Sequence, residues 1–161
     1  MNDWLKSHDE KSGREWAYYN IKPRIICEKL LPKDKNNDLP DYKFFCFNGK
    51  AHYLYVINGR QPGQKVHLGI FDIDYHKLDY DRLDEKKMLE MPEKPKNFDK
   101  MIEIAEKLSQ GFPHVRVDLY NIEGKIYFGE LTFYDGSGYQ KYEPEEFDYI
   151  LGDLFKLPEK K

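Results

Sequence analysis

One basic and two acidic side chains stand in two neighbouring strand-like stretches of this 161-residue chain. The first stretch contains Arg116-x-Asp118, and the second contains Glu130. Side chains two residues apart on a strand point to the same face, so Arg116 and Asp118 share one face. Two carboxylates that converge from adjacent strands suit a hard divalent cation. These residue types therefore point to a metal site, provided that the strands pair in the right register.

The register depends on the turn between the two stretches. Residues 115–133 are rich in β-branched and aromatic residues and predict a β-hairpin. A three-residue loop over 122–124, with Gly124 left-handed, places Glu130 on the Asp118 face, one diagonal step of roughly 7–8 Å away. A loop of two or four residues would shift the parity and send Glu130 to the opposite face.

A structural interpretation of the same residues stays open. Arg116 and Asp118 could form an exposed ion pair on a hairpin, which would contribute little. Glu130 is harder to explain in this way, because Gly129 and Leu131 place it inside an apolar strand where a charge is less expected.

The elements around the hairpin predict an α+β fold, in which an antiparallel sheet carries helices packed on one face. The Asn48-Gly49 turn is the strongest hairpin signal in the chain. A helix is predicted after Asn97 as its cap, with apolar residues at helical spacing. The other expected elements are strands over 25–31, 41–47, 50–57 and 70–75, a weak helix over 84–90, and helices over 98–108 and 143–151.

Length and composition indicate one domain. A net charge of −3 with both signs mixed argues against a general polyanion-binding protein, so nucleic acid is not an expected partner. No apolar run approaches the length of a membrane span. Cys27 and Cys46 are predicted to be buried free thiols, which is typical of a reducing compartment. The prediction is a soluble cytoplasmic protein.

Three motifs resemble a known family. Arg116-x-Asp118, Glu130-Leu131-Thr132 and Gly136-Ser137-Gly138 are similar to the C-terminal lobe of ATP-grasp ligases. With residues 25–31 and 41–45, the pattern resembles the TupA-like branch, which is associated with teichuronopeptide and capsular polysaccharide assembly in bacteria. The resemblance divides the chain into an N-terminal extension over 1–21 and an ATP-grasp-like domain, binding nucleotide and Mg²⁺, over 22–161.

The resemblance implies an ATP- and Mg²⁺-dependent carboxylate–amine ligase that works through an acylphosphate. Such chemistry needs carboxylates to hold Mg²⁺ and cations to stabilise the phosphoryl group. The resemblance implies that Asp118 and Glu130 are Mg²⁺ ligands and that Arg116 stabilises the charge of the transferred phosphoryl group. Thr132 stands where the family usually has Asn, so it would be a shorter oxygen ligand.

The same resemblance assigns the nucleotide and acceptor contacts. The backbone of Glu28-Lys29-Leu30-Leu31 would meet the adenine, and Asp41 would reach the ribose hydroxyls. Gly136-Ser137-Gly138 would approach the acceptor or a phosphate through backbone N–H groups. An alternative is that these glycines serve only a turn.

The chain also departs from the family. The first ATP-grasp lobe supplies a phosphate-binding lysine and a Gly-rich loop, and nothing before Lys22 resembles them. The expectation is a truncated or split ligase, with a possible partner chain that supplies the N-terminal lobe. The alternative is a catalytically inactive binding or scaffold domain, associated with a glycosyltransferase or with a separate N-terminal lobe.

Overall fold

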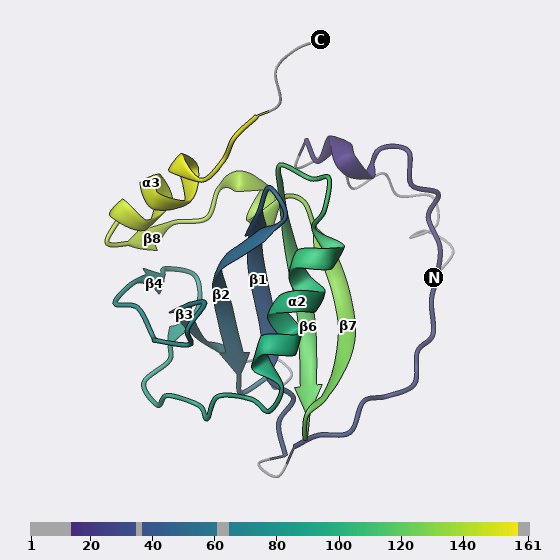
Figure 1. Ribbon diagram of the computed structural model, residues 1–161, viewed down its shortest axis with the longest axis vertical. Coiled ribbons are helices and arrows are strands. Elements are labelled where there is room, and N and C mark those ends of the chain that lie inside the picture. The colour runs from purple at the N-terminus through teal and green to yellow at the C-terminus, as the bar shows by residue number, and fades with distance from the viewer. Residues whose placement is uncertain (1–13, 35–36, 61–64, 158–161) are drawn as a thin grey trace.

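A six-stranded sheet forms the body of the protein (Figure 1). The computed structural model describes residues 14–34, 37–60 and 65–157. The elements in chain order are η2 (Trp16–Tyr18), β1 (Asp41–Phe47), β2 (Lys50–Asn58), β3 (His67–Asp72), β4 (Asp81–Arg82), β5 (Lys86–Lys87), α2 (Phe98–Leu108), β6 (His114–Ile122), β7 (Lys125–Thr132), η3 (Asp135–Gly138), β8 (Tyr142–Glu143) and α3 (Glu146–Asp153).

The sheet has the strand order β5-β3-β2-β1-β6-β7, and β4 pairs with β8 in a second, two-stranded sheet. The predicted α+β class is confirmed, but the sheet is mixed, because β5 runs parallel to β3. The connection over 73–85 is long enough to bring the chain back beside β3 in the same direction, as a parallel pair requires. That connection and β5 also replace the helix predicted over 84–90.

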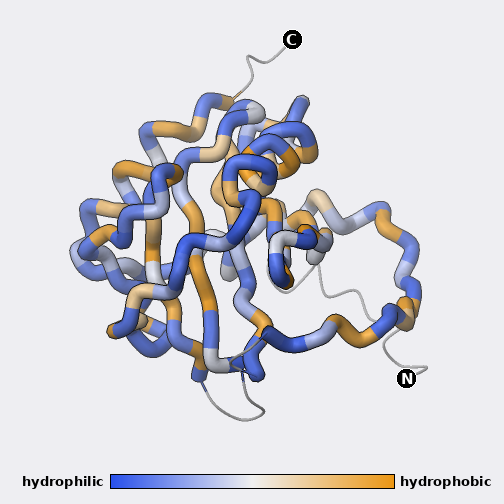
Figure 2. Tube along the Cα trace, turned by 60° about the horizontal axis from the view of Figure 1, so that its bottom comes forward, coloured by the Kyte–Doolittle hydropathy of each residue, from blue (hydrophilic) through white to orange (hydrophobic). Residues whose placement is uncertain are grey.

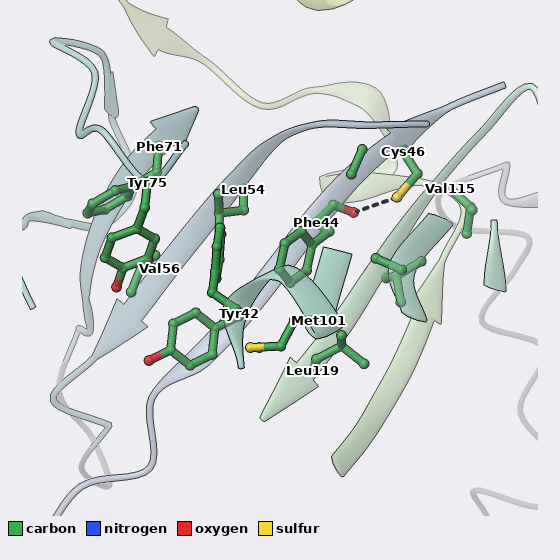
Figure 3. Packing of buried hydrophobic residues seen from close by; sticks show 14 of the residues in the cluster. Tyr42, Phe44, Cys46, Leu54, Val56, Phe71, Tyr75, Met101, Val115 and Leu119 are labelled. Carbon is green, nitrogen blue, oxygen red and sulfur yellow. Dashed lines mark hydrogen bonds between the residues drawn. The ribbon is translucent and has the colours of Figure 1, made fainter. Parts of the chain in front are cut away.

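Helix α2 covers one face of the sheet over an apolar cluster. Phe98, Met101 and Ala105 of the helix are buried there, and Figure 3 shows Met101 packed beside sheet residues such as Phe44 and Leu119. The predicted helix has the predicted bounds. Asn97 is the N-cap residue, as predicted, and its carbonyl accepts the first helix hydrogen bond from Met101. Its side chain does not cap the helix, because its Nδ2 donates to the Gly124 carbonyl at 2.8 Å.

Helix α3 packs on the opposite face, so the prediction of helices on one face is wrong. Its Phe147 is fully buried in a second apolar cluster with Phe45, Phe47 and Tyr55 from β1 and β2. Both faces of these two strands carry apolar side chains at this end, and each face must therefore be covered.

Residues 21–34 belong to no sheet, and Figure 2 shows hydrophobic stretches of this segment in orange. The buried strand predicted over 25–31 is wrong: Ile26 is 84% and Leu30 is 91% exposed, and this run has no assigned secondary structure. In the described part of the chain no strand pairs with it, and a strand without a ladder is not stable.

The two cysteines have different environments. Both are free thiols, as predicted, but Cys27 lies in the exposed run before β1 and is therefore not buried. Cys46 lies in the core, and burial raises the pKa of its thiol to about 12. None of the helices in the described residues is long and apolar enough to span a membrane.

We expect a thiol-alkylating reagent at neutral pH to modify Cys27 rapidly and Cys46 only after unfolding. The thiolate is the nucleophile, and both burial and the raised pKa suppress it at Cys46. Mass spectrometry of peptides after a timed reaction, with and without denaturant, measures the two rates. Equal rates in the native protein would contradict the placement of Cys46 in the core.

Candidate functional site

Strand pairing gathers charged side chains on the face of the sheet opposite α2. Lys43 of β1 lies directly across from Asp118 of β6, and Asp41 lies across from Tyr120. Arg116 shares the Asp118 face, as the sequence predicted, while the alternate residues of β6 enter the core. Two central strands thus bring two acids and two bases together.

A β-bulge puts Glu130 on this face. The hairpin loop has two residues, Glu123 and Gly124, both with positive φ, so the predicted three-residue loop is wrong. A two-residue loop alone would send Glu130 into the core. However, Gly129 and Glu130 together oppose the single residue Asp118, and this extra residue returns the Glu130 side chain to the Asp118 face.

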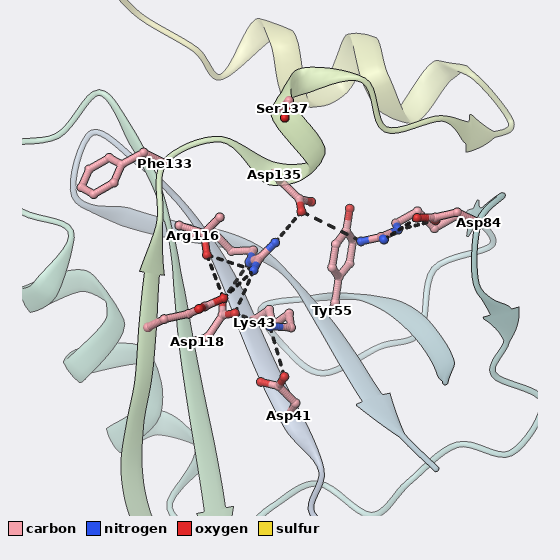
Figure 4. Close-up of polar contacts among 12 residues, drawn as sticks. Asp41, Lys43, Tyr55, Asp84, Arg116, Asp118, Phe133, Asp135 and Ser137 are labelled. Carbon is pink, nitrogen blue, oxygen red and sulfur yellow. Dashed lines mark hydrogen bonds and ion pairs between the residues drawn. The ribbon is translucent and has the colours of Figure 1, made fainter. Parts of the chain in front are cut away.

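Arg116 is the centre of the cluster (Figure 4). Its Nε and Nη2 donate to the two carboxylate oxygens of Asp118, each at 2.8 Å, in a bidentate pair. Nη2 also reaches Thr132 Oγ1 at 3.0 Å and Glu130 Oε1 at 3.4 Å, and Nη1 donates to Asp135. Burial would lower the pKa of Arg116, but its hydrogen bonds and the charges of Asp118, Asp135 and Glu130 raise it above the ordinary value.

Lys43 joins Asp118 to Asp41. Its ammonium donates to Asp118 Oδ2 and lies 3.1 Å from Asp41 Oδ2. Asp41 is only 2% exposed, and burial raises the pKa of its carboxyl, although Lys43 opposes the shift. Oδ1 of Asp41 is buried without a hydrogen-bond partner among the described residues. An orphaned buried acceptor is costly, so this oxygen is suited to a ligand that donates a hydrogen bond.

A cavity of about 840 Å³ connects this cluster to the segment before β1. Asp41, Lys43, Asp118 and Glu130 line it on the sheet side, and residues 28–32 line the other side. The structure therefore places the predicted adenine-binding run, Glu28-Lys29-Leu30-Leu31, across the same cavity from the predicted metal ligands.

The remaining predicted site residues lie elsewhere. Gly136, Ser137 and Gly138 form η3 and are not among the residues that line this cavity. All three have positive φ, and Ser137 Oγ donates to Glu15 at 2.7 Å. Thr132 is held by Arg116 and does not line the cavity either.

The donor set fits a hard cation. Asp118, Glu130 and Thr132 offer only oxygen atoms, which Mg²⁺ prefers. Glu130 is well exposed, with a side chain 63% accessible, whereas both oxygens of Asp118 are bound by Arg116 and Lys43. A metal ion would therefore compete with two side-chain cations for Asp118.

Lys43 and Asp135 were missed by the sequence analysis. Lys43 has a detectable signal, because alternation along 41–47 places it on the same face as the predicted Asp41. Asp135 comes directly before the Gly-rich run, and no local pattern predicts that it contacts Arg116.

We expect Lys43→Met to lower the free energy of unfolding by about 3 kcal/mol or more. The change removes the cation that lies between the two buried carboxylates of Asp41 and Asp118, and breaking a buried ion pair costs this much even though Arg60 and Arg116 still contact them. Chemical denaturation measures the loss. Lys50→Met is the matched control, because its ion pair with Glu106 is exposed and should contribute at most about 1 kcal/mol.

We expect Gly129→Ala to destabilise the protein by about 1 kcal/mol or more, since a Cβ there would lie 3.0 Å from the backbone oxygen of Asp118. Gly152→Ala in α3 meets no atom within 4 Å and should instead stabilise by up to about 1 kcal/mol. Thermal unfolding of the two variants compares them. Equal stability would show that the bulge tolerates a side chain.

Comparison with known proteins assigns the chain to a family. No curated protein and no solved structure matches the chain significantly. The sequence model of the family described as TupA-like ATPgrasp matches residues 1–156, nearly the whole chain. This family typically uses ATP and Mg²⁺, and membership implies a nucleotide-binding domain of the ATP-grasp ligase type. The chain belongs to the TupA-like ATP-grasp family.

Proposed function

We propose that this chain binds Mg²⁺ and ATP in the 840 Å³ cavity and acts in an ATP-dependent carboxylate–amine ligation. The observation that carries the proposal is the convergence of Asp118 and Glu130 on one nitrogen of Arg116. Side chains of two adjacent strands thus meet beside a cavity that reaches the segment before β1.

The nucleotide would lie between the sheet and residues 28–31. The exposed backbone of Glu28-Lys29-Leu30-Leu31 would hydrogen-bond the adenine edge. Asp41 would accept a hydrogen bond from a ribose hydroxyl, and its unpartnered Oδ1 supports this role. The phosphates would then point toward Lys43 and Arg116.

Asp118 and Glu130 would hold Mg²⁺, with the Thr132 hydroxyl as a further oxygen donor. Bound Mg²⁺ would neutralise the charge of the β- and γ-phosphates. Lys43 supports the proposal because its ammonium already contacts the Asp118 carboxylate. When Mg²⁺ binds that carboxylate, the ammonium would be released to bind a phosphate. Arg116 would stabilise the charge that spreads over the transferred phosphoryl group.

The overall reaction would transfer the γ-phosphoryl group of ATP to a carboxylate, which gives an acylphosphate and ADP. An amine would then attack the acyl carbon, lose a proton and expel inorganic phosphate, which leaves an amide. We assign the reaction to the synthesis of a cell-surface polysaccharide or peptide polymer, as the resemblance implied.

A partner surface is part of this proposal. Trp16, Ile26 and Leu30 precede β1 in the chain and are 63%, 84% and 91% exposed, which leaves three large apolar side chains in contact with solvent. A second lobe packed on them, from this protein or from a partner chain, would bury them and close the nucleotide cavity.

Calorimetry with ATP tests the nucleotide site. We expect Mg²⁺-dependent binding by the wild type, and Glu130→Gln should weaken it at least about tenfold, because even groups that only orient metal ligands contribute about 10–100-fold to affinity. Asp118→Asn should abolish it. Glu130 is well exposed, so its variant should keep the wild-type fold.

Glu123→Gln is the matched control, because Glu123 is an equally exposed glutamate in the turn of the same hairpin. It should bind Mg²⁺ and ATP as the wild type does. No binding by the wild type at millimolar nucleotide would contradict the proposal and favour a scaffold domain. Binding that is the same in Glu130→Gln would mean that the metal lies elsewhere.

A further inference from the structure

A second cavity, of about 540 Å³, lies on the charged face of the sheet. Lys43 and Arg60 line both cavities, so the second adjoins the first. Its lining has three acidic side chains and five basic ones, the latter being Lys43, Arg60, Lys65, Arg82 and Arg116. Neither the sequence motifs nor the proposed nucleotide site uses Lys65 or Arg82.

Arg82 of β4 is held rigidly in the wall of this cavity. Its Nε and Nη2 donate to the two oxygens of Asp84 at 2.7 and 2.6 Å, and its guanidinium lies over the Tyr55 ring, 5.4 Å from the centroid. The side chain is only 12% exposed. A guanidinium fixed in this way loses little conformational entropy when it binds a ligand.

One nitrogen of Arg82 remains available. Nη1 lies 4.0 Å from Asp135 Oδ1, which is beyond hydrogen-bond distance, and it has no hydrogen bond to the described residues. Lys65 likewise makes no ion pair within the part of the chain that the structure describes. Arg82 Nη1 and the Lys65 ammonium therefore keep hydrogen-bond donors for an anionic ligand, while Asp135 and Asp84 interact with them electrostatically.

The cavity is also connected to the reacting centre. Asp135 binds Arg116 through the same oxygen that faces Arg82, so one carboxylate lies between the two guanidinium groups. Ile57, Val66 and Leu68 are buried beneath the cavity, and its accessible surface is mostly polar and open to solvent.

We propose that this cavity is the subsite for an anionic group of the acceptor substrate, a carboxylate or a phosphate bound by Arg82 Nη1 and Lys65. The role in the reaction rests on the proposed function, whereas anion binding itself does not. An acceptor anchored here would lie beside Arg116. Arg82 and Lys65 would then determine that acceptors with a negative charge are preferred over neutral ones.

Calorimetric titration with inorganic phosphate and with succinate tests the subsite, in the absence and in the presence of Mg²⁺ and a non-hydrolysable ATP analogue. We expect millimolar binding of at least one probe that persists with the analogue bound. Lys65→Gln and Arg82→Gln should each weaken it roughly tenfold, since a hydrogen bond to a charged group is worth about that factor. Tighter binding of phosphate would indicate a phosphorylated acceptor, and tighter binding of succinate a carboxylate.

Lys107→Gln on α2 is the control, since α2 lies on the opposite face of the sheet, and it should bind the probes as the wild type does. If Arg82→Gln fails to fold, probe binding by Lys65→Gln alone tests the subsite. Lys65 is exposed, so this variant should keep the wild-type fold. Binding of neither probe, or unchanged binding in Lys65→Gln and any folded Arg82→Gln, would overturn the proposal. Probe binding without any nucleotide binding would instead keep the anion subsite and refute the proposed function.

Discussion

The buried guanidinium of Arg116 is the interaction on which the charged face of the sheet depends. A buried ion is stable only when its partners compensate for lost hydration, and Arg116 has Asp118 in a bidentate pair and Asp135 on the other side. These contacts link β6 to the segment after β7. The contact of Arg116 with Asp135 therefore helps to position the chain beyond the hairpin, together with the hydrogen bonds of Phe133 to Tyr18 and of Ser137 to Glu15.

The face that carries this charge is divided along β1. Asp41 and Lys43 occupy its first half, whereas Phe45 and Phe47 of the same face are buried in the cluster under α3. One half of the face is thus the candidate site and the other half is core. Because the apolar half holds the strands in place, the polar half can remain open to a ligand without loss of the fold.

Local sequence signals predicted the elements whose stability is local. The Asn48-Gly49 hairpin and the helix over 98–108 follow from turn chemistry and apolar spacing, and both are present. The run over 25–31 was misplaced, because an apolar stretch indicates a strand only if a partner strand exists. The face chosen by α3 depends on contacts between distant parts of the chain, which periodicity cannot provide.

The candidate site was also predicted only where its contacts follow from local sequence. Alternation identified Arg116 and Asp118 as neighbours on one face, and the structure brings Glu130 to them through a different turn. The contact of Lys43 with Asp118 required the β1–β6 register, which joins residues 75 positions apart. The contact of Asp135 with Arg116 depends on the path of the chain after β7, where all three residues of Gly136-Ser137-Gly138 have positive φ.

The bulge at Gly129 has an evolutionary consequence. Since the extra residue in β7 compensates for a turn of even length, parity rather than the count of residues between Asp118 and Glu130 determines whether the two acids meet. A related hairpin that gains one residue in its turn can keep the same arrangement by losing the bulge. Such a paired insertion and deletion leaves the number of residues between the two acids unchanged, so the spacing of the two acids does not reveal which of the two turns a related hairpin has.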